Sequence, residues 1–97
     1  MRGYVIARIT VTDPDAYSEY RDGVLATVEP HGGKYLVRGG PFDCLEGEWP
    51  NERVVVIEFP SVEQARAWYQ SDDYQTLAGI RQSASRGTLI LIAGAES

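Results

Sequence analysis

The chain has 97 residues, of which 43% are hydrophobic and 24% are charged, which is typical of a globular domain and unlike a disordered segment. We therefore expect a single domain spanning residues 1–97. Nine basic and fourteen acidic residues give a net charge of −5, and no basic cluster offsets it. This balance argues against a nucleic-acid partner and against an anionic membrane surface.

Two residue counts limit the chemistry further. Cys44 is the only cysteine and His31 the only histidine, so we expect neither an internal disulfide nor an ordinary structural zinc site, and no metal. No apolar run approaches the ~20 residues of a membrane helix, and the N-terminal residues alternate like a strand rather than forming a signal peptide. We expect a cytoplasmic protein.

The first predicted element is a strand over residues 4–11. Val5, Ala7 and Ile9 form a wholly apolar face, whereas the residues between them form a mixed one. Such alternation is typical of a strand with one face against a core and one face against something partly polar.

A helix is predicted to follow, beginning near Asp13 and ending before Pro30. Pro14 suits a first helical turn, and Tyr17 and Tyr20 belong to an apolar series at three-to-four spacing. Residues 33–39 then predict a second strand.

The second half of the chain repeats this pattern of elements. After a turn-rich loop over residues 40–52, residues 53–59 predict the most hydrophobic strand. Ser61 can cap the next helix, which we expect to break and restart at Ser71. Residues 87–94 predict the fourth strand.

This order of elements predicts an α+β, ferredoxin-like βαββαβ fold with a four-stranded antiparallel sheet. Right-handed crossovers place the helices on one face of the sheet, with the first and third strands in the centre. The other face would expose large aliphatic side chains, which favours a homodimer that packs sheet against sheet. Arg8 on that face is a candidate for an ion pair between subunits, and Trp49 for covering a sheet edge.

Arg38 and Arg81 are the basic residues that we single out. Arg38 lies in a strand among apolar residues, so it needs a partner if it points inward. That partner is either a protein carboxylate, Glu58 or Glu46, or a carboxylate ligand held by the guanidinium group. Arg81 has the same two interpretations.

The aromatic residues also allow two interpretations. Trp68, Tyr69 and Tyr74 surround the helix break and are either core residues or the wall of a pocket. Tyr17 and Tyr20 could line the same cavity from the first helix.

His31 is either a turn residue or an acid/base group, and no spacing identifies a partner for it. Cys44 has acidic neighbours, which argues against a nucleophilic thiol.

Four segments, "YVIARITVTDPDAY", "GGKYLVRGG", "LEGEWPNERVVVIEFPS" and "WYQSDDYQTLAGIR", resemble domain-of-unknown-function family 1330 (DUF1330) of the dimeric α/β-barrel superfamily. The resemblance implies a two-fold dimeric α/β barrel and a pocket between the sheet and the helices of each subunit. By motif position, it implies the pocket candidates Tyr17, His31, Arg38, Tyr69, Tyr74 and Arg81.

The resemblance does not select one reaction. Superfamily relatives include cofactor-independent monooxygenases, haem-degrading enzymes, isomerases and stress-response proteins. We expect a small-molecule pocket for an anionic or aromatic compound, with no cofactor. The alternatives are a cofactor-independent monooxygenase or isomerase acting on a ring compound, with His31 or a tyrosine as the base, and a non-catalytic, stress-associated interaction module.

Overall fold

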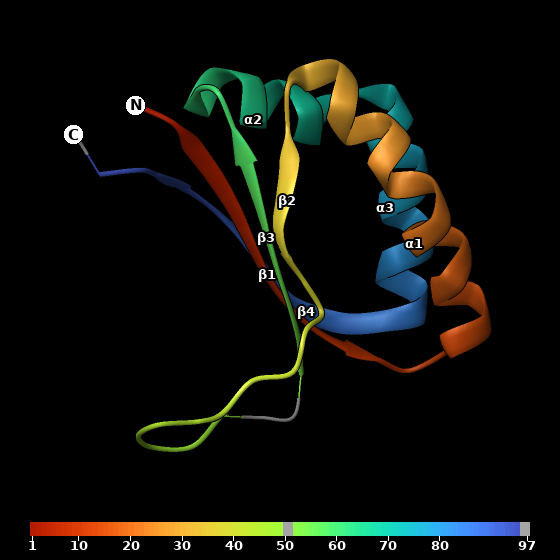
Figure 1. Cartoon of the computed structure of the whole chain (residues 1–97). Helices are drawn as coiled ribbons and strands as arrows, with labels where there is room; N and C mark the ends of the chain where they lie inside the picture. The colour runs from red at the N-terminus through yellow and green to blue at the C-terminus, as the bar shows by residue number, and fades with distance from the viewer. Residues whose placement is uncertain (50–51, 96–97) are drawn as a thin grey trace.

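A computed structural model describes residues 1–49 and 52–95, in which a four-stranded antiparallel sheet and three α-helices form two layers (Figure 1). The elements are β1 (Gly3–Val11), α1 (Pro14–Val28), a 3-10 helix (Glu29–His31), β2 (Lys34–Arg38), β3 (Arg53–Phe59), α2 (Val62–Gln70), α3 (Asp72–Ala84) and β4 (Ser85–Ala93). The predicted ferredoxin-like order is confirmed, with the second helical segment divided into α2 and α3.

The strands lie in the order β2-β3-β1-β4, so β1 and β3 are central, as predicted. β1 pairs antiparallel with both β3 and β4. The two remaining strands form the edges of the sheet. The fourth strand begins at Ser85, two residues earlier than predicted, because α3 runs directly into it.

The helices cover one face of the sheet only (Figure 1). On that face β1 contributes the buried side chains Val5, Ala7 and Ile9, and β3 contributes a similar buried series. The opposite face, called the open face below, carries Ile6 next to Val56 and Ile90 in the adjacent strands.

Serine and aspartate side chains fix the helix starts. The Asp13 carboxylate accepts from the Ala16 N–H at 3.2 Å, and the Ser61 hydroxyl accepts from the Gln64 N–H at 3.1 Å. Such caps satisfy N–H groups that have no partner within the helix. At the other end of α1, Gly32 has a φ of +78°, which glycine adopts without strain.

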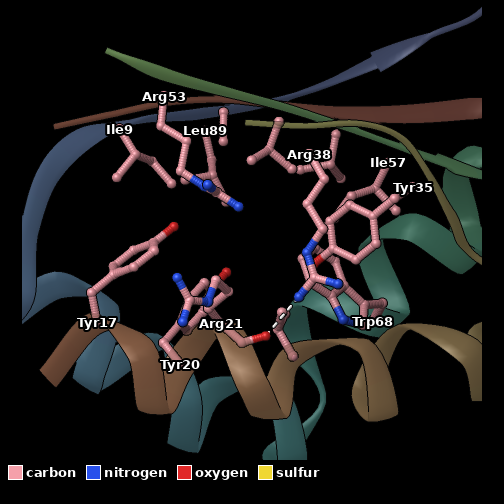
Figure 2. Close-up of a pocket in the computed structure, with 14 residues that line it drawn as sticks. Ile9, Tyr17, Tyr20, Arg21, Tyr35, Arg38, Arg53, Ile57, Trp68 and Leu89 are labelled. Atoms are coloured by element: carbon pink, nitrogen blue, oxygen red, sulfur yellow. Dashed lines mark hydrogen bonds between the residues drawn. The ribbon is translucent and has the colours of Figure 1, made fainter. Parts of the chain in front are cut away.

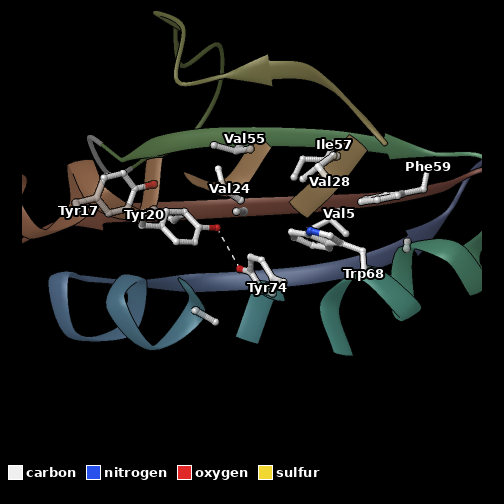
Figure 3. Packing of buried hydrophobic residues seen from close by; sticks show 14 of the residues in the cluster. Val5, Tyr17, Tyr20, Val24, Val28, Val55, Ile57, Phe59, Trp68 and Tyr74 are labelled. Atoms are coloured by element: carbon white, nitrogen blue, oxygen red, sulfur yellow. Dashed lines mark hydrogen bonds between the residues drawn. The ribbon is translucent and has the colours of Figure 1, made fainter. Parts of the chain in front are cut away.

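The core between the layers is built around aromatic rings (Figure 3). Trp68 is fully buried, with its ring 4.1 Å from that of Tyr74 and 5.4 Å from that of Phe59. Its indole N–H donates to the Thr27 hydroxyl at 3.0 Å, so the polar atom of this large side chain is satisfied. Trp68 and Tyr74 are therefore core residues.

The loop after β2 leaves the body of the domain on the side of the open face (Figure 1). Trp49 from this loop lies over Arg8, with 4.6 Å between the guanidinium carbon and the ring centroid. Arg8 also pairs with Glu52 at 3.2 Å. Arg8 thus has partners within its own chain, and its ion pair between subunits stays a prediction.

Candidate functional site

A cavity lies between α1 and the covered face of the sheet (Figure 2). Its sheet side is mainly aliphatic, its helix side carries Tyr17, Tyr20 and Arg21, and Arg38 and Arg53 reach into it from β2 and β3. Its volume of about 20 Å³ is room for roughly one water molecule. Side chains, rather than backbone, restrict this space.

A β-bulge in β2 directs Arg38 toward the cavity. Tyr35 lies opposite Ile57, and Arg38 lies opposite Val55. Two residues of β2 separate Tyr35 from Arg38, whereas only one residue of β3 separates Val55 from Ile57. Strict alternation would put Arg38 on the open face. The extra residue therefore moves Arg38 to the side that faces α1, a re-aiming that bulges often provide.

The Arg38 guanidinium bridges β2 and α1. Its Nη2 atom donates to the Arg21 carbonyl oxygen at 2.6 Å, and its central carbon lies 4.4 Å from the centroid of the Tyr35 ring. Arg38 forms an ion pair with neither Glu58 nor Glu46, so the predicted protein carboxylate partner is wrong. A neutral carbonyl leaves the positive charge of Arg38 without a counter-charge.

Glu58 is occupied elsewhere, on the open face. It accepts from the Tyr4 hydroxyl at 3.1 Å and pairs with Arg2 at 3.4 Å and Lys34 at 3.6 Å. Desolvation favours the neutral carboxyl group, but the hydrogen bond from Tyr4 and the two positive charges outweigh it and lower the pKa of Glu58.

Arg53 is the second arginine in the cavity. It begins β3 on the same face as the buried Val55 and Ile57, and its guanidinium lies 6.0 Å from the centroid of the Tyr17 ring. Its Nε atom is buried and has no hydrogen-bond partner among the described residues. Gly39, with a φ of +71°, leaves room for this guanidinium, since a β-carbon there would collide with it.

Arg81 lies in the layer behind the cavity. Its side chain projects from α3 among core residues with only 6% exposure, and its Nε atom also lacks a partner in residues 1–49 and 52–95. Its positive charge acts to lower the pKa of Tyr17 and of Tyr20, although burial outweighs this effect. No described carboxylate forms an ion pair with Arg38, Arg53 or Arg81.

The tyrosines around the cavity are neutral at physiological pH. Burial raises the pKa of Tyr17 and of Tyr20, and it raises the pKa of Tyr35 to about 12. The Tyr20 hydroxyl also lies 3.1 Å from that of Tyr74 (Figure 3). These hydroxyls can donate hydrogen bonds, but a raised pKa makes each of the three a poor base.

Two of the six predicted pocket residues, Tyr17 and Arg38, line the cavity. Tyr74 lies next to it, since its hydroxyl is 3.1 Å from that of the lining residue Tyr20, and Arg81 is buried among the core residues of α3. Tyr69 lies apart from the cavity, in an open groove between α2 and β4.

His31 does not join this group. It is half-buried in the 3-10 helix, beyond the C-terminal end of α1, whereas Tyr17 lies in the first turns of α1. The separation of 14 residues corresponds to about 20 Å along a helix axis. The turn interpretation of His31 agrees with this position, and His31 is not among the residues that line the cavity.

Sequence reasoning missed Arg53 and Tyr35. The signal for Arg53 was available, because in "RVVVIEF" it shares the alternating face of the residues that turn out to be buried. Tyr35 precedes the bulge and obeys simple alternation, but nothing in the sequence showed which face of this edge strand would meet α1.

The described part of the chain contains no group of three or more histidine, cysteine or acidic side chains positioned to hold a metal ion. In residues 1–49 and 52–95, no helix combines the length and apolar character needed to cross a bilayer.

Comparison with known families places this geometry in a wider group. The model of the family described as "Domain of unknown function (DUF1330)" matches residues 2–95. The chain belongs to the DUF1330 family. No curated protein matches it significantly.

Solved structures share the fold of this DUF1330 chain. RPA0582 from Rhodopseudomonas palustris, a protein of unknown function, has a TM-score of 0.78 and 19% identity, over 99% of this chain and 84% of that one. SnoaB from Streptomyces nogalater, a cofactor-independent oxygenase, has a TM-score of 0.64 and 13% identity, over 99% and 95%. A dimeric ferredoxin-like protein of unknown function from Jannaschia sp. CCS1 has a TM-score of 0.66 and 10% identity, over 97% and 100%.

Proposed function

We propose that this DUF1330 protein is a cytoplasmic homodimer in which each subunit binds a small anionic, partly aromatic molecule in the cavity between α1 and the sheet. The observation that carries the proposal is that Arg38 and Arg53 both line one cavity and that no carboxylate among the described residues pairs with either. The Nε atom of Arg53 is buried without a hydrogen-bond partner among these residues, and leaving such a group unpaired is costly. An anionic ligand supplies the missing counter-charge.

Binding requires the cavity to open. Arg38 is exposed, and its hydrogen bond to the Arg21 carbonyl spans the space between β2 and α1. When this side chain swings outward, the cavity enlarges beyond its present volume of about 20 Å³ without disturbing the core. Ligand pockets commonly have a mostly apolar lining with a few charged groups that fix orientation, and this lining has that character.

The open face supports the dimer. Leu36, Ile90 and Ile92 are each about half exposed, at 49%, 52% and 47%. Exposed aliphatic patches of this kind usually mark an interface. The similarity to the Jannaschia protein, which is dimeric, supports a dimer here as well.

The experiment is native mass spectrometry of the purified protein, followed by titration calorimetry with aromatic and aliphatic carboxylates and phosphates. We expect a dimer and at least one anion that binds. Arg53→Gln should weaken that binding at least tenfold, because it removes a charge beside the ligand. Arg66→Gln removes an exposed arginine of α2 outside the cavity and is the matched control. An equal loss of anion affinity in Arg53→Gln and Arg66→Gln contradicts the proposal. So does a wild-type protein that binds no anion.

A second candidate function is oxygenation of a bound ring compound without a cofactor, which the similarity to SnoaB supports. Because Tyr17 is neutral, it would serve as a hydrogen-bond donor, while Arg53 would stabilise a phenolate form of the substrate. The test is oxygen consumption with dihydroxynaphthalenes. Activity that survives Arg53→Gln unchanged would contradict this role.

A further inference from the structure

The positive charge of the cavity is divided between two ends. Figure 2 shows Arg53 and Tyr17 on one side of the hollow and Arg38 and Tyr35 on the other. The two ends differ in solvation, since Arg53 is half-buried, whereas Arg38 is exposed.

A ligand with one negative charge cannot balance both ends. If its anionic group lies at Arg53, the guanidinium of Arg38 stays without a counter-charge and loses water as the mouth fills. If it lies at Arg38 instead, Arg53 remains unpaired. Two anionic groups at opposite ends of one molecule satisfy both positions.

The space between the two ends suits a flat, apolar body. The sheet side of the cavity is aliphatic, including Ile9, Val55 and Ile57, and the Tyr17 and Tyr35 rings stand at its sides. An aromatic ring packs well against such surfaces and holds its substituents in fixed directions. A flexible aliphatic chain would lose more conformational freedom on binding.

We propose that the ligand class is a rigid aromatic dianion with its two charged groups on opposite sides of the ring, such as a benzene-1,4-dicarboxylate. One carboxylate binds Arg53, and the other binds Arg38 in place of the Arg21 carbonyl. This inference rests on the proposed function and specifies the ligand of the same cavity.

The test is calorimetric titration of the purified protein with benzene-1,4-dicarboxylate, benzene-1,2-dicarboxylate and benzoate at one pH and one ionic strength. We expect the 1,4-isomer to bind at least tenfold more tightly than either of the others, because only it reaches both ends. Arg38→Gln should reduce this preference over benzoate to less than threefold. Since Arg38 is exposed, the variant should fold, and Arg66→Gln should leave the preference unchanged.

Three outcomes overturn the inference while leaving the anion site intact. In the first, benzoate binds as tightly as the 1,4-isomer and both lose affinity in Arg53→Gln. In the second, the 1,2-isomer binds best, which means that both charged groups are bound at one end. In the third, none of the three acids binds but another anion does, so that the anion site survives and this ligand class is wrong. If no anion binds at all, the proposed function itself fails.

Discussion

Arg81 is a charged residue in a position where the fold would otherwise favour an apolar one. It is 6% exposed, its neighbours on α3 are core residues, and its Nε atom has no partner in the described part of the chain. Desolvating such a group opposes folding.

Replacing Arg81 should therefore stabilise the free protein. We expect Arg81→Met to raise the free energy of unfolding by about 1–3 kcal/mol, because an apolar side chain of similar length fills the same space without an unpaired charge. Urea unfolding measures this, and the exposed Arg66→Met should change it by less than about 0.5 kcal/mol. A clear loss of stability in Arg81→Met would mean that the guanidinium group makes stabilising contacts, and our view of it would be wrong.

Tyr35 gives a pH dependence on the alkaline side. Its pKa is raised to about 12 by burial, from an ordinary value of 10.0. Between these values the unfolded chain has released the Tyr35 proton while the folded chain retains it, so the free energy of unfolding falls as the pH rises. Urea unfolding at pH 9, 10 and 11 should show this decline, and it should be shallower in Tyr35→Phe. An identical slope in both proteins would contradict the assignment.

Single residues were predictable to different degrees. The position of Tyr17 followed from helical spacing, and that of Arg53 could have followed from strand alternation. The partner of Arg38 could not be predicted, because it is a backbone carbonyl group. Every residue has one, so the sequence does not indicate that Arg21 provides it. Likewise, no local pattern distinguishes Tyr74, which is fully buried, from Tyr69, which is not.

At the scale of elements, the bulge in β2 decides which residues face the cavity. The run "KYLVR" reads as continuous alternation, and strict alternation separates Tyr35 from Arg38. The observed register puts them on the same face. The existence of β2 was therefore predictable. The face of the sheet on which its last residue, Arg38, lies depended on pairing with β3, which is a tertiary property.

The break between α2 and α3 was predictable, because Ser71 is a favoured capping residue. Its hydroxyl accepts from the Tyr74 N–H at 3.2 Å and donates to the Trp68 carbonyl at 2.7 Å. Ser71→Ala should lower the free energy of unfolding by about 1 kcal/mol, since both groups lose this partner. Ser83→Ala, at an exposed position within α3, is the control and should change stability little. Equal effects in thermal or urea unfolding would contradict the capping role.

For the whole molecule, the topology was predictable because the order of elements and right-handed crossovers leave few alternatives. The open face followed from the same reasoning, since the helices can cover one face only. The volume of the cavity could not be predicted in this way, because it depends on how Arg38 and its neighbours pack.

Disrupting the open face should separate the proposed dimer. Ile90 lies beside Ile6 and is 52% exposed, so Ile90→Glu would place a charge in the sheet-to-sheet contact. We expect light scattering after gel filtration to report a monomer for this variant and a dimer for the wild type. Leu25→Glu, on the outer side of α1 with 39% exposure, is the control and should remain dimeric. If the wild-type protein is a monomer, the proposed sheet-to-sheet dimer is contradicted.

The opposite signs of charge outside and inside the molecule have a kinetic consequence. The chain carries a net charge of −5, yet the groups around the cavity are guanidinium ions. An approaching anion is repelled at long range and attracted only at short range. Salt at 0.1 M screens charges separated by more than about 10 Å and acts less on partly buried ones. Ligand association should therefore become faster as ionic strength rises, the reverse of electrostatic steering, so that entry depends on the concentration of surrounding ions as well as on affinity.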